Sequence, residues 1–139
     1  MTIIPDRDLQ SALNDALNDA FPAMPIAWEN YEYTPTMGTA YLKVWLIPAD
    51  NEVKTLGPNP WQERKGIFQV SVFEPQGIGF GIPKSKAAEV VAAFQSNTSF
   101  IYNGLTVIID RSEILAGRND EKGWYHIPVN IRYRCYYAD

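Results

Sequence analysis

Residues 124–137 read Trp-Tyr-His-Ile-Pro-Val-Asn-Ile-Arg-Tyr-Arg-Cys-Tyr-Tyr, and this stretch decides the fold. Apolar or aromatic side chains occupy every second position from Tyr125 to Tyr137, and the positions between them are more polar. Because successive side chains of a β-strand point to opposite faces, the alternation predicts one long strand with one face packed on a core. Such a strand needs partner strands from the rest of the chain.

The segment just before this strand predicts a β-hairpin. Residues 99–102 and 105–110 have strand composition and flank Asn103-Gly104, the dipeptide most typical of a two-residue hairpin turn. Residues 116–123 are polar and charged, and we expect a turn there. The hairpin and the turn together lead the chain into the long strand.

Two segments have helical periodicity. The first is residues 6–20, where Asp6 is placed to cap the first turn and Pro22 marks the end. The second is residues 83–94, because Pro83 suits a first helical turn, where its missing N–H is not needed. The expected buried stripes are Leu9, Leu13, Ala16, Leu17 and Ala20 in the first helix, and Ala87, Val90, Val91 and Phe94 in the second.

Between the helices the sequence predicts three strands. Residues 26–33 and 40–47 are expected to pair antiparallel, and residues 66–74 form the third strand. Residues 48–65 contain prolines and many charges without an apolar period, so we expect a long loop, and loops of this length are usually functional or mobile. The whole reading is one α+β domain over residues 1–139, with two helices on one face of a mainly antiparallel sheet, in the order α-β-β-β-α-β-β-β.

The composition disfavours several classes of function. The 139 residues carry a net charge of −4 and no run of basic residues, which disfavours binding to nucleic acid through phosphates. Aromatic residues make up 13% of the chain, more than one small core easily encloses with every polar ring atom satisfied, so we expect some at interfaces. No signal peptide or membrane-spanning run is expected, and a single cysteine favours a cytosolic origin.

Catalytic and metal sites are not supported by the residue pattern. His126 and Cys135 are nine residues apart on one predicted strand, so they point to opposite faces and cannot form a dyad within one chain. We interpret Cys135 as a core residue and His126 as a surface or hydrogen-bonding residue. The paired carboxylates Glu29 and Glu32, or Asp50 and Glu52, are read as solvated.

The glycine-rich segment at residues 77–81 lies between a strand and a helix, where phosphate is often bound. Its spacing fails both nucleotide fingerprints, because Ile82 stands where glycine or alanine is needed and Pro83 precedes Lys84. We therefore interpret it as a crossover that lets the chain turn or that opposes a neighbouring subunit. A small α+β enzyme or ligand-binding module that uses this loop with Lys84 and Lys86 is the rival hypothesis.

Several motifs taken together resemble one known family. They are the run Thr34-Pro35-Thr36-Met37-Gly38-Thr39-Ala40-Tyr41-Leu42-Lys43-Val44, then Thr55-Leu56-Gly57, Gly66-Ile67-Phe68-Gln69-Val70-Ser71-Val72, Pro75-Gln76-Gly77-Ile78-Gly79 and Gly123-Trp124-Tyr125-His126-Ile127-Pro128-Val129. Over roughly residues 25–135 the chain resembles the phage tail-terminator and minor-tail proteins of siphophages and prophages. It departs from them at Tyr31-Glu32, where a more apolar pair is expected.

The resemblance implies a structural protein and no enzyme. Such proteins form a ring, typically a hexamer, that caps the tail tube, stops its growth and presents a surface to the head connector. The implied partners are other copies of the chain, the tail tube protein and a head-tail connector protein, with no cofactor, no membrane and no sequence-specific nucleic acid. The protein would be made in the host cytoplasm and reside in the virion tail, and a head-side connector is the near alternative. The residues that we expect at interfaces are Trp61, Arg64, Lys65, Arg118 and Lys122.

Overall fold

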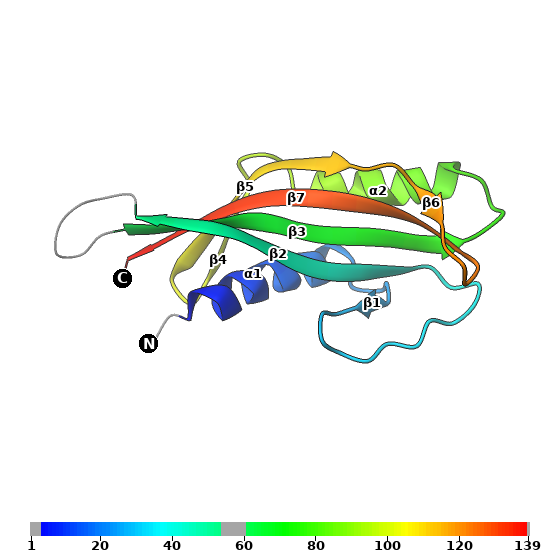
Figure 1. Cartoon of the computed structure of the whole chain (residues 1–139), viewed down its shortest axis with the longest axis horizontal. Coiled ribbons are helices and arrows are strands. Elements are labelled where there is room, and N and C mark those ends of the chain that lie inside the picture. Colours follow the sequence, from blue (N-terminus) through cyan, green and yellow to red (C-terminus); the bar gives the residue numbers. More distant parts are fainter. Residues whose placement is uncertain (1–3, 54–60, 139) are drawn as a thin grey trace.

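The computed structural model describes residues 4–53 and 61–138, and within them the α+β prediction is confirmed. A curled, mostly antiparallel sheet has the strand order β1-β2-β3-β7-β5-β4, with β6 paired to β7 (Figure 1). The helices are α1 (Pro5–Ala20) and α2 (Gly81–Ala93). The strands are β1 (Ile26–Ala27), β2 (Tyr41–Val53), β3 (Trp61–Pro75), β4 (Ser99–Tyr102), β5 (Leu105–Ile114), β6 (Arg118–Asn119) and β7 (Trp124–Ala138).

β7 is the central organising strand, as its alternation predicts. It pairs with β3 along its whole length and with β5 on the other side. The alternate positions from Ile127 to Tyr137 are buried in one core, to which both helices contribute. The helices therefore cover the same face of the sheet, called here the core face, and the other face is called the open face.

The prediction of a long loop at residues 48–65 is wrong for the residues that the structure describes. Residues 48–53 continue β2 and residues 61–65 begin β3, and the two pair antiparallel after a register shift between Pro48 and Asn51. Residues 54–60 lie outside the described part of the chain. The prolines and charges leave these residues without a local strand signal. Residues 61–65 are extended because they pair with the end of β7, which is distant in sequence.

The first predicted strand is also corrected. Only Ile26–Ala27 is extended, and it pairs parallel with β2 instead of antiparallel. The predicted turn at 116–123 contains the short strand β6, which pairs with the start of β7. The hairpin turn is confirmed, since Asn103 and Gly104 both have positive φ, as this tight turn requires.

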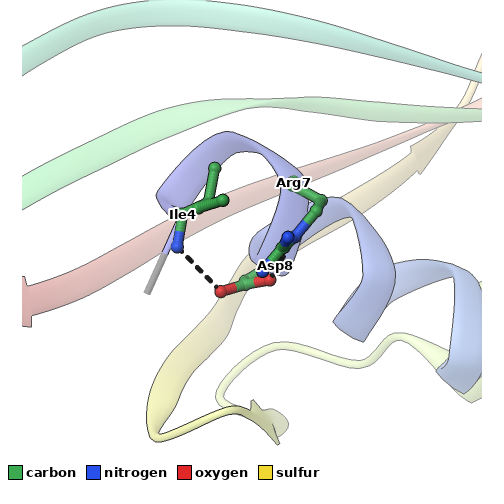
Figure 2. A network of polar contacts seen from close by, with 3 residues as sticks. All are labelled: Ile4, Arg7 and Asp8. Atoms are coloured by element: carbon green, nitrogen blue, oxygen red, sulfur yellow. Dashed lines mark hydrogen bonds and ion pairs between the residues drawn. The ribbon is translucent and has the colours of Figure 1, made fainter. Parts of the chain in front are cut away.

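Helix α1 begins one residue earlier than predicted, and its cap is a different residue. Pro5 follows the N-cap residue Ile4, whose backbone N–H donates to Asp8 Oδ2 at 2.9 Å, while Arg7 Nε donates to Asp8 Oδ1 at 2.9 Å (Figure 2). Burial raises the pKa of Asp8, but the hydrogen bonds from Arg7 and Ile4 outweigh it and hold the pKa below its usual value. Asp6 is therefore not the N-cap, and the carboxylate that accepts a backbone N–H at the start of α1 is that of the buried Asp8.

Gly66 lies where two strands and an aromatic ring meet. It is the register partner of Tyr133 in β7 and of Pro48 in β2. A Cβ atom at this position would lie 2.5 Å from Tyr133 Oη and 2.6 Å from the carbonyl oxygen of Ile47. The missing side chain therefore lets the buried Tyr133 ring lie against the backbone of β3.

Candidate assembly surface

The five predicted interface residues do not gather in one place. Trp61, Arg64 and Lys65 begin β3, whereas Arg118 and Lys122 lie beside the start of β7. Because β3 and β7 are antiparallel and pair from end to end, these two groups lie at opposite ends of the sheet. One docking surface cannot include all five residues in a single subunit.

Arg64 holds two elements of its own chain together. Its guanidinium donates to Asp6 Oδ1 at 2.8 Å and to the Tyr137 hydroxyl at 3.1 Å, and it lies 5.5 Å from the centre of the Tyr137 ring. The contact with Asp6 ties the start of α1 to the sheet. Lys65 is more accessible, with 47% of its side chain exposed and an ion pair to Glu63 at 3.2 Å. Interface roles for both residues stay predictions.

At the opposite end, a tight turn places Lys122. Asp120 Oδ1 accepts the backbone N–H groups of Lys122 and Trp124, at 2.8 and 3.0 Å. Arg118 donates through Nε to Nε2 of His126 at 3.3 Å. These contacts fix the turn beside a cleft that the sequence did not predict.

This aromatic cleft is a hollow of about 700 Å³ on the open face. On its floor the Tyr41 ring stacks on Phe73 at 4.7 Å and meets Trp124 edge to face at 5.1 Å, centre to centre. Tyr41 and Phe73 face away from the core because they alternate with core residues along β2 and β3. The residues that line the cleft are Ala27, Trp28, Glu29, Asn30, Tyr31, Tyr33, Pro35, Tyr41, Lys43, Val44, Trp45, Phe73, Asp120, Glu121, Lys122, Trp124 and His126.

His126 lines the cleft beside Phe73. Burial and the neighbouring charge of Arg118 lower its pKa from the usual value, and its ring stacks on Phe73 at 5.0 Å. Within the described part of the chain its buried Nδ1 atom has no hydrogen-bond partner. The role that the sequence assigned to His126, a hydrogen-bonding residue on the polar face, fits this position.

The segment that forms one wall of the cleft also covers the outer edge of strand β2. The backbone N–H of Leu42 donates to the carbonyl oxygen of Pro25 at 3.0 Å, and that of Leu46 donates to Glu29 Oε1 at 2.8 Å. The next residue in this alternating series is Pro48, which has no N–H. On this edge of β2 two backbone donors are thus occupied and a third is missing, which disfavours pairing with another chain there. Glu29, which the sequence suggested was solvated, has a structural contact.

The glycine-rich segment forms an apolar projection, called here the glycine knob (residues 76–82). Ile78, Phe80 and Ile82 are 45%, 68% and 59% exposed. Gly77 and Gly79 have φ of +89° and +84°, a backbone conformation that glycine adopts without strain. The ammonium group of Lys84 lies 5.2 Å from the centre of the Phe80 ring. Contiguous exposed apolar side chains of this kind mark interaction sites.

The His126 and Cys135 side chains lie on opposite faces of β7, as predicted. Cys135 belongs to the buried core, and burial raises its pKa to about 12. A thiol with so high a pKa is almost fully protonated near neutral pH, and the thiolate is the nucleophilic form. Among the described residues no cluster of three or more His, Cys, Asp or Glu side chains could hold a metal ion, and no helix there is long and apolar enough to cross a membrane.

Replacing Cys135 by Ser is expected to leave assembly activity intact. The thiol acts as a small apolar group, and a buried hydroxyl without a partner costs about 1–3 kcal/mol of unfolding free energy. Chemical denaturation measures that cost, and complementation of a deletion phage measures function. Full stability with complete loss of complementation would instead indicate a reactive thiol.

Comparison with known proteins agrees with this architecture. A family model described as phage tail terminator protein matches residues 8–133. One solved structure that carries no functional name is 25% identical, covers 96% of each chain and has a TM-score of 0.76. A chain of the virion of a native gene transfer agent particle shares the fold, with 19% identity, a TM-score of 0.65 and coverage of 98% of this chain and 100% of that one. No curated protein matches this chain.

Proposed function

Because the chain belongs to the phage tail terminator family, and is thus a structural component of a phage tail, we propose that it caps the tail tube, ends its growth and forms the surface that joins the head. The family match over residues 8–133 is the observation that carries the proposal. It spans both helices and most of the sheet, so it concerns the whole domain. The proposed role requires no chemical step.

The proposed assembly is a ring of identical subunits, and the proposed number of subunits is six. A ring is built from one heterologous contact repeated around an axis, so each subunit needs two different complementary surfaces. Closing the circle makes the last contact intramolecular, so that weak pairwise contacts become stable together. The tube end would template this closure, and the proposed partners are the tail tube protein on one side and the head-tail connector on the other.

Capping can be tested with purified components. Tail tube protein that polymerises alone should give long tubes of variable length, whereas addition of this protein during growth should shorten them. Electron microscopy with a labelled form of the protein should show label at one end only. Label along the tube walls, or growth that continues past labelled ends, would contradict the proposal.

A further inference from the structure

We propose that the glycine knob of one subunit inserts into the aromatic cleft of a second copy of the same chain. The inference rests on the proposed ring and names the contact that would build it. It joins two surface features of the described chain, the exposed apolar side chains of the knob and the open aromatic cleft.

The knob has the properties of an inserted element. Phe80 is 68% exposed although a phenyl ring gains by burial, and Ile82 is 59% exposed beside it. The two side chains stand at the start of α2, whose first turn is fixed by the Lys84 N–H donating to the Phe80 carbonyl at 2.9 Å. An anchor held on a rigid helix end loses little conformational freedom when it binds.

The cleft has the properties of a matching receptor. Its volume of about 700 Å³ lies within the range of about 300–1,000 Å³ seen for binding clefts, and its lining is dominated by aromatic rings. Trp45 is 53% exposed and Tyr31 is 78% exposed at its rim. Aromatic rings prefer edge or offset contacts with other rings, so the Phe80 ring is a suitable occupant.

The positions of the two features suit a ring. Gln76, at the base of the knob, donates through Nε2 to the backbone oxygens of Asp120 and Trp124 at 2.9 and 3.2 Å, so knob and cleft lie at the same end of the sheet. In Figure 1 the segment between β3 and α2 lies on the α2 side, whereas the segment between β1 and β2 lies on the other side. When two complementary surfaces lie on opposite sides of a subunit and at the same end of it, repeating their contact arranges the subunits around an axis and favours a closed ring.

Charge complementarity favours the same pairing. The cleft is lined by three carboxylates, from Glu29, Asp120 and Glu121, and by two ammonium groups, from Lys43 and Lys122, and the lowered pKa of His126 favours its neutral form. Its net charge is therefore −1.

The knob carries the ammonium group of Lys84 over its central ring. A positive charge that approaches a negative cleft selects this arrangement over contact between two knobs or between two clefts.

Cysteine cross-linking in assembled tails tests the contact. A phage carrying Phe80→Cys and Trp45→Cys in the same chain should, after treatment with a short bis-maleimide, give a ladder of cross-linked species that ends at the size of the closed ring. Cys135 does not interfere because it is buried and its pKa is about 12. The matched control combines Trp45→Cys with Ile101→Cys, since Ile101 is 74% exposed on β4 and should give no ladder.

Mixing the single variants distinguishes the proposed contact from others. Phe80→Cys chains together with Trp45→Cys chains should give cross-linked dimers and no longer species, and neither variant alone should cross-link. Dimers from Phe80→Cys alone, cross-links from Phe80→Cys to a different tail protein, or tails without any ladder would each overturn the proposal. Tyr31→Cys serves as a second cleft position, so that one poorly folded variant does not decide the result.

A charge variant gives an independent measurement. Phe80→Asp should reduce incorporation into tails at least tenfold, whereas Ile101→Asp should not. Asp is favourable at a helix N-terminus, so this variant is expected to stay folded. Equal incorporation of the two variants would overturn the proposal.

The failure of this contact can be told apart from the failure of the capping role. If the gene deletion gives overlong tubes, and tails of normal length that carry the two cysteines give no ladder, then the proposed contact alone is refuted. A ladder together with normal tails in the deletion would refute the capping role alone.

Discussion

A phage that lacks this gene is expected to produce heads and tail tubes that do not join, with tubes that grow past their normal length. Nothing would then stop addition of tube subunits or present a surface to the head connector. Electron microscopy of lysates gives the distribution of tube lengths, and plaque counts should fall to near zero. Expression of the wild-type chain from a plasmid should restore both. Deletion tails of normal length that are joined to heads would show that the proposed function is wrong.

The substitution Gly66→Ala is expected to destabilise the core strongly. Its Cβ atom would lie 2.6 Å from the carbonyl oxygen of Ile47, and a backbone atom cannot move aside without shifting β2. It would also meet the Tyr133 hydroxyl at 2.5 Å. Overpacking of this kind costs roughly 3 kcal/mol of unfolding free energy, and the midpoint of urea denaturation should fall accordingly.

A second glycine provides the matched control for this measurement. In the described structure a Cβ atom at Gly81 would meet nothing within 4 Å, and this residue is the first of α2. Gly81→Ala should therefore change the unfolding free energy by no more than about 1 kcal/mol, in the stabilising direction. Adding Tyr133→Phe to Gly66→Ala should restore little, because the clash with Ile47 remains. Similar costs for the two glycine substitutions would contradict the packing argument.

Local sequence patterns predict the elements that carry a strong period or a strong turn. The alternation in β7 and the Asn103-Gly104 turn depend on neighbouring residues, and both are confirmed. The strands at residues 48–53 and 61–65 have no such local signal. Residues 61–65 are extended because β3 pairs with β7 from Trp61 to Pro75, a contact between segments far apart in the chain, and residues 48–53 pair in turn with β3.

The candidate assembly surface is predictable only in part. The aromatic surplus correctly indicates rings outside the main core, but it does not say that residues 28–45 and 120–126 enclose them together. Charge alone suggests Arg64 as a docking residue, whereas the structure gives it Asp6, 58 residues away in the sequence, as a partner. A partner this distant cannot be read from local sequence patterns.

The blocked edge of β2 has a consequence for the life of the protein before a tail is finished. A sheet edge with free N–H groups can recruit any extended chain, and copies that wait in a crowded cell would then form fibres. Here Pro25 and Glu29 occupy the donors of Leu42 and Leu46, and Pro48 removes the next one. Backbone pairing between waiting copies is therefore disfavoured along this edge of β2, where contacts between copies depend on side-chain surfaces.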